Sequence, residues 1–139
     1  MRKLLIDVNV VLDVLLDRQP HGRASAAVWA AVESGRAEGL LSAHAVTTIH
    51  YLVARERGGA FARRAIAALL QVFRVATVDQ LVVQRALQLA PTDFEDAVTA
   101  AAAERAKCDG IVTRDPRGFR ESPVRALTPE AAGALLARQ

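Results

Sequence analysis

Short apolar runs recur along the chain and carry the pattern of buried β-strands. Four of them occupy residues 3–8, 39–42, 72–78 and 110–113, and a shorter run at 124–127 is a candidate fifth. Continuous apolar runs of this length are typical of strands that are buried on both faces of a parallel sheet. The pattern therefore predicts a central parallel sheet of four or five strands.

The segments between these runs have helical patterns. Apolar residues in 24–34 recur at helical spacing, and Gly35 is a suitable residue to end that helix. Pro129 suits the first turn of a last helix. Helices are predicted at residues 10–17, 24–34, 44–57, 60–70, 80–89 and 92–107 and from Pro129 onward. Strands that alternate with helices indicate an α/β layer fold.

Size and composition favour one globular domain over residues 1–139. The chain is 52% hydrophobic and 24% charged, and its net charge is +3. That mild positive charge is compatible with a polyanionic partner but does not require one. A lone cysteine excludes an intrachain disulfide. No apolar stretch is long enough to cross a membrane, and Asp7 interrupts the first apolar run as no signal peptide would, so we expect a cytoplasmic protein without membrane attachment.

Three acids stand at the edges of apolar segments. Asp7 closes the first predicted strand, Asp96 lies at the start of the helix 92–107, and Asp115 follows the fourth strand. In open α/β sheets, ligands bind at the carboxyl ends of strands, where the strand order changes direction. If the first and fourth strands are neighbours, the three carboxylates converge there. Oxygen donors without cysteine favour Mg²⁺ or Mn²⁺.

Each acid also has a purely structural interpretation. Thr92 and Glu95 fit a capping box, which accounts for Glu95 without a functional role, and Asp93 lies in the first turn and can share a face with Asp96. Asp115 can simply begin a turn. Asp13 lies in the first helix, where an orienting or capping role is favoured over metal ligation. The pair His44 and His50 does not share a helix face, which disfavours a histidine metal site.

With these residues in place, the chain resembles the PIN domain family, the metal-dependent ribonucleases that include VapC-like toxins. The resemblance rests on three motifs, which are Asp7-Val8-Asn9-Val10-Val11-Leu12-Asp13, Asp93-Phe94-Glu95-Asp96-Ala97-Val98 and Ile111-Val112-Thr113-Arg114-Asp115 with Phe119 beyond. Their order, spacing and strand–helix context together span nearly the whole chain.

The resemblance implies a three-layer α/β/α sandwich whose acids bind Mg²⁺ or Mn²⁺. Asp7, Asp96 and Asp115 match three family acids, while Asn9 and Thr113 match polar residues that line the same site. The family usually supplies a further glutamate in the helix after the second strand. Here that position falls near Thr48. Asp93 or Glu95 can replace the missing charge; otherwise the site holds one metal or none.

These observations lead to one favoured function and two rivals. The favoured one is metal-dependent hydrolysis of RNA by Asp7, Asp96 and Asp115, with the RNA backbone guided by arginines, which are Arg114, Arg117, Arg120 and Arg125. Toxin behaviour would imply a cognate antitoxin, and family members often form homodimers. The main rival, motivated by Thr48, is a PIN-like module that binds RNA or protein without catalysis. A phosphatase with a nucleophilic aspartate is disfavoured because Asn9 occupies the second position of its Asp-x-Asp motif.

Overall fold

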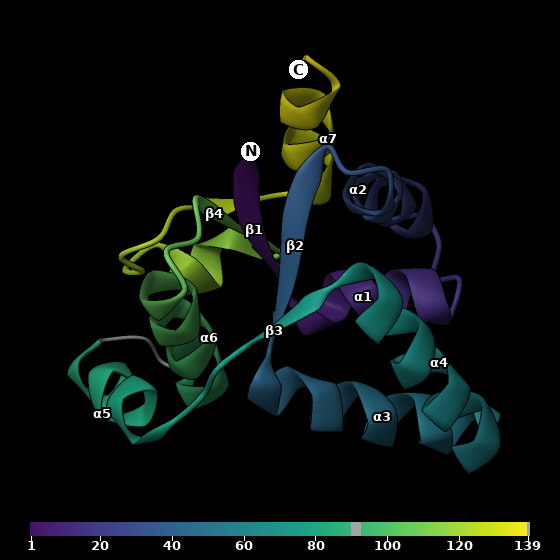
Figure 1. Cartoon of the computed structure of the whole chain (residues 1–139), viewed down its shortest axis with the longest axis horizontal. Coiled ribbons are helices and arrows are strands. Elements are labelled where there is room, and N and C mark those ends of the chain that lie inside the picture. The colour runs from purple at the N-terminus through teal and green to yellow at the C-terminus, as the bar shows by residue number, and fades with distance from the viewer. Residues whose placement is uncertain (90–92, 139) are drawn as a thin grey trace.

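A computed structural model describes residues 1–89 and 93–138 and contains one parallel sheet. Its strand order is β3-β2-β1-β4-β5, so β1 is central and lies between β2 and β4 (Figure 1). All five predicted strands are present. Their bounds are β1 Arg2–Ile6, β2 Ala37–Ser42, β3 Arg74–Ala76, β4 Gly110–Val112 and β5 Ala126–Leu127.

Helices cover both faces of the sheet, which confirms the predicted three-layer α/β/α sandwich. Figure 1 shows α5 and α6 on one side of the strands and α1 to α4 on the other. The helix α7 packs on α2. The helices are α1 Val8–Leu15, α2 Gly22–Glu33, α3 Ala43–Arg57, α4 Gly59–Val72, α5 Gln80–Gln88, α6 Phe94–Arg105 and α7 Pro129–Ala137, with a short 3₁₀ helix, η1, at Pro116–Phe119.

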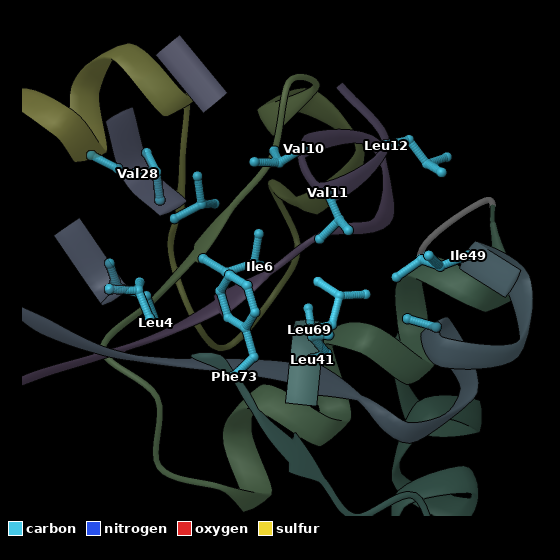
Figure 2. Packing of buried hydrophobic residues seen from close by; sticks show 14 of the residues in the cluster. Leu4, Ile6, Val10, Val11, Leu12, Val28, Leu41, Ile49, Leu69 and Phe73 are labelled. Atoms are coloured by element: carbon cyan, nitrogen blue, oxygen red, sulfur yellow. The ribbon is translucent and has the colours of Figure 1, made fainter. Parts of the chain in front are cut away.

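The alternation of side chains along β1 divides the core into two clusters. Leu4 and Ile6 point to the face that α1 to α4 cover, and there they pack with Leu41, Leu69 and Phe73 (Figure 2). Leu5 points to the opposite face, which packs against α5 and α6. Because β1 is buried on both faces, its end is held firmly at the centre of the molecule.

Alanine lets α6 lie close to the sheet. Five alanines of this helix are buried, with Ala102 and Ala103 entirely inaccessible to solvent; the set is Ala97, Ala100, Ala101, Ala102 and Ala103. A helix with such small side chains on the sheet side brings its N-terminal turn to the edge where β1 and β4 end. None of the described helices is long and apolar enough to cross a membrane.

Several element boundaries differ from the prediction by a few residues, and two of these differences concern the acids at the strand and helix ends. The first strand ends at Ile6 instead of residue 8, because the side chain of Asp7 accepts the N–H of Val8 and starts α1 there. The predicted helix 92–107 begins at Phe94, with Asp93 as its N-cap. The predicted capping box on Thr92 is therefore wrong in its register, and Thr92 itself lies outside the described residues.

Candidate active site

The candidate site lies where the order of strands reverses. The chain adds β2 on one side of β1 and later adds β4 on its other side, so the ends of β1 and β4 flank the switch point. Asp7 follows β1 directly, and its backbone N–H donates to Val112 O of β4 at 2.9 Å. This hydrogen bond extends the pairing of the two strands to their ends and places Asp7 beside Thr113.

The buried hydroxyl of Thr113 connects the polar groups of this edge. It donates to Asp7 Oδ2 at 2.8 Å and accepts from the backbone N–H of Asp115 at 3.2 Å. Asn9 Nδ2 lies 3.4 Å from the same hydroxyl, and Asn9 Oδ1 accepts the backbone N–H of Arg114 at 3.3 Å. Thr113 and Asn9, both predicted as supporting residues, thus fix the orientation of Asp7 and the path of the chain to Asp115.

The first turn of α6 brings Asp96 to the same edge. Asp93 Oδ1 accepts the backbone N–H of Asp96 at 3.2 Å, so Asp93 serves as the cap of the helix. A Cβ on Gly118 of η1 would lie 3.0 Å from Asp96 Oδ2 and 4.0 Å from Asp115 Oδ2. The carboxylates of Asp96 and Asp115 therefore both lie beside the backbone of Gly118, where the absence of a side chain leaves room next to them.

A cavity of about 270 Å³ opens between α1, α3 and α6, and we call it the acidic cavity. The polar residues that line this cavity include Asp7, Asn9, Arg18, His44, Thr48, Glu95 and Asp96. Asp96 and Asp7 line it, whereas Asp115 does not and lies at an exposed rim with 68% of its side chain accessible. The predicted carboxylates thus divide into an inner pair and one outer acid.

Burial and like charge disfavour ionisation of the inner pair. Burial is the main cause that raises the pKa of Asp7, while hydrogen bonds from Thr113 and Val8 oppose the shift. For Asp96, partial burial and then the charge of Asp7 raise the pKa to about 6, with further contributions from Asp93, Asp115 and Glu95. Such a concentration of negative charge favours a cation as its counter-ion.

The donor types fit a hydrated divalent cation. Within residues 1–89 and 93–138, no three His, Cys, Asp or Glu side chains lie close enough together to hold one ion directly. Mg²⁺ usually keeps several waters and takes only one or two carboxylates from the protein. One or two of these carboxylates, with water between the cation and the others, therefore suit Mg²⁺ or Mn²⁺.

A buried ion pair supports the loop that carries Asp115. Asp13 of α1 is fully buried, and its Oδ2 lies 2.8 Å from Arg114 Nε and 3.2 Å from Ser25 Oγ. Asp13 therefore acts as the orienting group that its position in α1 predicts. The side chain of Arg114 is directed inward, whereas that of Arg117 is 89% exposed and lies 3.9 Å from Asp115 at the rim.

Sequence comparison gives the family. A family profile described as "PIN domain" matches residues 3–117, which is most of the chain. The chain belongs to the PIN domain family. The resemblance drawn from the three motifs is therefore confirmed. No curated protein matches the sequence significantly.

Solved structures share this PIN fold. FitAcB from Neisseria gonorrhoeae is 22% identical with a TM-score of 0.71, and the match covers 91% of this chain and 97% of that one. VapC20 from Mycobacterium tuberculosis, described as a toxin that cleaves the sarcin–ricin loop, is 18% identical with a TM-score of 0.65 over 78% and 86%. DNA-bound VapBC from Salmonella typhimurium is 16% identical with a TM-score of 0.72 over 93% and 99%. The chain therefore shares its fold with these three proteins.

The PIN fold also brings in residues that sequence reasoning undervalued or missed. Glu95, interpreted as part of a capping box, lies 3.4 Å from Thr48 Oγ1 through its Oε1. His44 lines the acidic cavity, and its buried Nδ1 has no hydrogen-bond partner among the described residues. Arg18 carried no recognisable signal, because it lies in an irregular segment between α1 and α2. Contacts between α3 and α6 are tertiary, so spacing along the sequence does not reveal them.

Proposed function

We propose that this PIN domain is a divalent-metal-dependent endoribonuclease that hydrolyses RNA phosphodiester bonds, and that it is the toxin of a toxin–antitoxin pair. One observation carries the proposal: three distant segments bring Asp7, Asp96 and Asp115 to the switch point of the sheet. Membership of a nuclease family gives this arrangement its chemical meaning. The carboxyl ends of strands at a switch point are where α/β folds bind their ligands.

In this proposal one or two of Asp7, Asp96 and Asp115 bind Mg²⁺ or Mn²⁺ directly, and the others reach the ion through its bound water. Such an ion, when bound, lowers the pKa of its water and stabilises charge on phosphate oxygens. Thr113 keeps Asp7 oriented by donating to Oδ2, so that the carboxylate loses little freedom when it binds. Asn9 holds the Arg114 peptide and thereby the approach to Asp115.

The RNA would approach across the exposed rim. Arg117 is the arginine best placed to meet a phosphate there, since its side chain is 89% exposed beside Asp115. Arg114 remains a candidate for the same role, but its ion pair with Asp13 competes for the guanidinium. A single-stranded substrate suits this surface because its backbone can bend toward carboxylates that lie at an edge of the sheet.

Cleavage of RNA by purified protein tests the proposal. With Mn²⁺ present, the wild-type protein should cut a single-stranded RNA, and EDTA should stop the reaction. Asp7→Asn should abolish cleavage while leaving the fold intact, because asparagine is an equally good helix N-cap. Glu130→Gln, which removes an exposed acid from the first turn of α7, is the matched control and should cut normally. Equal cutting by wild type and Asp7→Asn would identify a contaminating nuclease and refute the assignment.

A second candidate function is binding without catalysis. It is favoured by one observation, that Thr48 occupies the part of α3 where the family usually has a glutamate. A binding module would not need the cation. Titration with Mn²⁺ should therefore leave its melting temperature unchanged, whereas a metal-dependent nuclease should be stabilised. In the nuclease, Asp115→Asn should reduce that stabilisation.

The proposed partners follow from the toxin role. A cognate antitoxin would hold the protein inactive in the cytoplasm, by analogy with a structural neighbour from Klebsiella pneumoniae that is described as a toxin–antitoxin complex. A homodimer is supported by exposed apolar side chains on α5, where Leu81 is 53% and Leu87 70% accessible. Sedimentation analysis of Leu87→Glu checks this: the wild type should be dimeric and the variant monomeric, and two identical profiles would exclude α5 from the interface.

A further inference from the structure

We propose that Glu95, held by Thr48, is a third carboxylate of the acidic cavity and that it binds the water shell of the cation. The inference rests on the proposed metal-dependent function and deepens it. It assigns to α6 a charge that would otherwise have to come from α3. Glu95 is thus a positioning residue for the cation and its water.

The first support is the location of Glu95. Among the described residues, the acids that line the acidic cavity are Asp7, Glu95 and Asp96, and Asp115 lies outside it. Asp96 borders this cavity and also lies beside Gly118, next to Asp115. Asp96 therefore lies between two acidic regions, and Glu95 belongs to the inner one with Asp7.

The second support is the contact with α3. Thr48 Oγ1 donates to Glu95 Oε1 at 3.4 Å, across 47 residues of sequence. This leaves Glu95 Oε2 without a hydrogen bond to a described residue, so one oxygen is held by the protein and the other is available for water. A helix dipole favours an acid anywhere in the first turn, but it does not direct the side chain toward another helix.

The third support is the absence of a competing role for Glu95 in the described part of the chain. Asp93 already caps α6, so the helix start does not depend on Glu95. No Lys or Arg of residues 1–89 and 93–138 forms an ion pair with Glu95. Glu95 lines the acidic cavity together with Asp7 and Asp96, so the like charges of these carboxylates repel one another. A hydrated cation between these carboxylates would turn that repulsion into attraction.

The chemistry limits what Glu95 can do. Because no three acids of residues 1–89 and 93–138 are close enough to ligate one ion together, an ion bound directly by Asp7 and Asp96 would reach Glu95 only through water. A carboxylate in such an outer position orients the coordinated water and adds attraction for the ion. Loss of an outer-shell group of this kind typically weakens metal binding by about 10- to 100-fold.

Calorimetric titration of the metal-free protein with Mn²⁺ tests the assignment without relying on activity. Glu95→Gln should weaken binding by about 10- to 100-fold. Thr48→Val should weaken Mn²⁺ binding by a smaller factor. Thr48→Ser should bind Mn²⁺ like the wild type, because serine keeps the hydroxyl. Glu130→Gln is the control, because it also removes an acid from the first turn of a helix, α7, but away from the cavity. This variant should bind Mn²⁺ like the wild type.

The outcomes separate this inference from the function on which it rests. If Glu95→Gln binds Mn²⁺ as tightly as Glu130→Gln while Asp7→Asn does not bind, the role of Glu95 is refuted and the metal site stands. If the wild type itself fails to bind Mn²⁺, both the inference and the metal-dependent function are refuted. Circular dichroism of each variant ensures that a loss of binding reflects the site and not unfolding.

Discussion

Replacing Asp96 by asparagine should stabilise the metal-free protein at neutral pH. Partial burial, followed by the charges of Asp7, Asp93, Asp115 and Glu95, raises the pKa of Asp96 from 3.8 to about 6. Ionised Asp96 is therefore unfavourable in the folded state. Asparagine keeps the shape of the side chain and removes the charge, and the bond to Asp93 is unaffected because it comes from the backbone N–H.

The sign and size of the effect follow from linkage. A carboxyl whose pKa is higher in the folded than in the unfolded protein binds its proton more tightly when folded. The stability due to this group is complete below pH 3.8 and is lost as the pH rises through about 6. At about 1.36 kcal/mol per pKa unit the full difference is about 3 kcal/mol. Solvent screening at this partly exposed carboxylate reduces the expected value to about 1–2 kcal/mol.

Urea and thermal unfolding in EDTA measure this difference. At about pH 7.5, Asp96→Asn should unfold with about 1–2 kcal/mol more free energy than the wild type, or about 3–8 °C higher in Tm. Near pH 4 the gain should largely disappear. Glu121→Gln is the control, since Glu121 is an exposed acid that is not among the charges raising the pKa of Asp96.

The reasoning would be refuted by either of two results. One is a loss of stability in Asp96→Asn at pH 7.5, which would show that the carboxylate is stabilising when ionised. The other is a gain that stays the same at pH 4, which would show that the effect is unrelated to ionisation. Saturating Mn²⁺ should reverse the order of the two proteins, because the wild type alone keeps the full set of carboxylates for the ion.

Three further substitutions probe the scaffold. Arg114→Met leaves the buried carboxylate of Asp13 without a cationic partner and should cost about 3 kcal/mol in urea unfolding. Asp13→Asn in the same chain should recover part of this loss, and fully additive effects of the two substitutions would contradict the ion pair. Gly39→Ala places a Cβ 2.7 Å from the ring of Phe73 and should cost about 1–3 kcal/mol, so an unchanged Tm would contradict the packing. Thr113→Val removes the hydroxyl that orients Asp7, and it should lower the free energy of unfolding by about 2 kcal/mol and weaken Mn²⁺ binding in calorimetry. Thr113→Ser should keep most of the stability and most of the Mn²⁺ affinity. Equal behaviour of the two variants would contradict a role for the hydroxyl.

The sequence predicted the strands well because burial on both faces leaves a strong local pattern. Each of the five apolar runs became a strand, and the acids that follow two of them lie at the switch point as expected. The start of α6 was harder to predict, because Thr92, Asp93 and Asp96 all have side chains that can cap a helix. Only the folded chain shows that Asp93 is the cap, since capping depends on backbone angles as well as residue type.

The contacts of Glu95 and Arg114 escaped local reasoning for a different reason. A first-turn acid and an arginine beside a strand end both have ordinary interpretations as solvated side chains. Their partners, Thr48 and Asp13, lie on other helices far away in the sequence. Helical periodicity gives the face of a residue on its own helix but not the neighbour that this face meets. Such contacts depend on how α1, α3 and α6 are arranged around the sheet.

The arrangement of the site explains how the fold tolerates so much negative charge. Asp7 lies at the end of a strand that is buried by both core clusters. Its backbone N–H donates a hydrogen bond to Val112 O, and its carboxylate accepts hydrogen bonds from Thr113 Oγ1 and the backbone N–H of Val8. Asp115 instead lies at the rim, where solvent screens its charge. Asp96 lies between them, and partial burial together with repulsion from the neighbouring acids raises its pKa to about 6. Because ionisation of Asp96 is unfavourable among these charges, a cation bound at the proposed site would stabilise its carboxylate strongly.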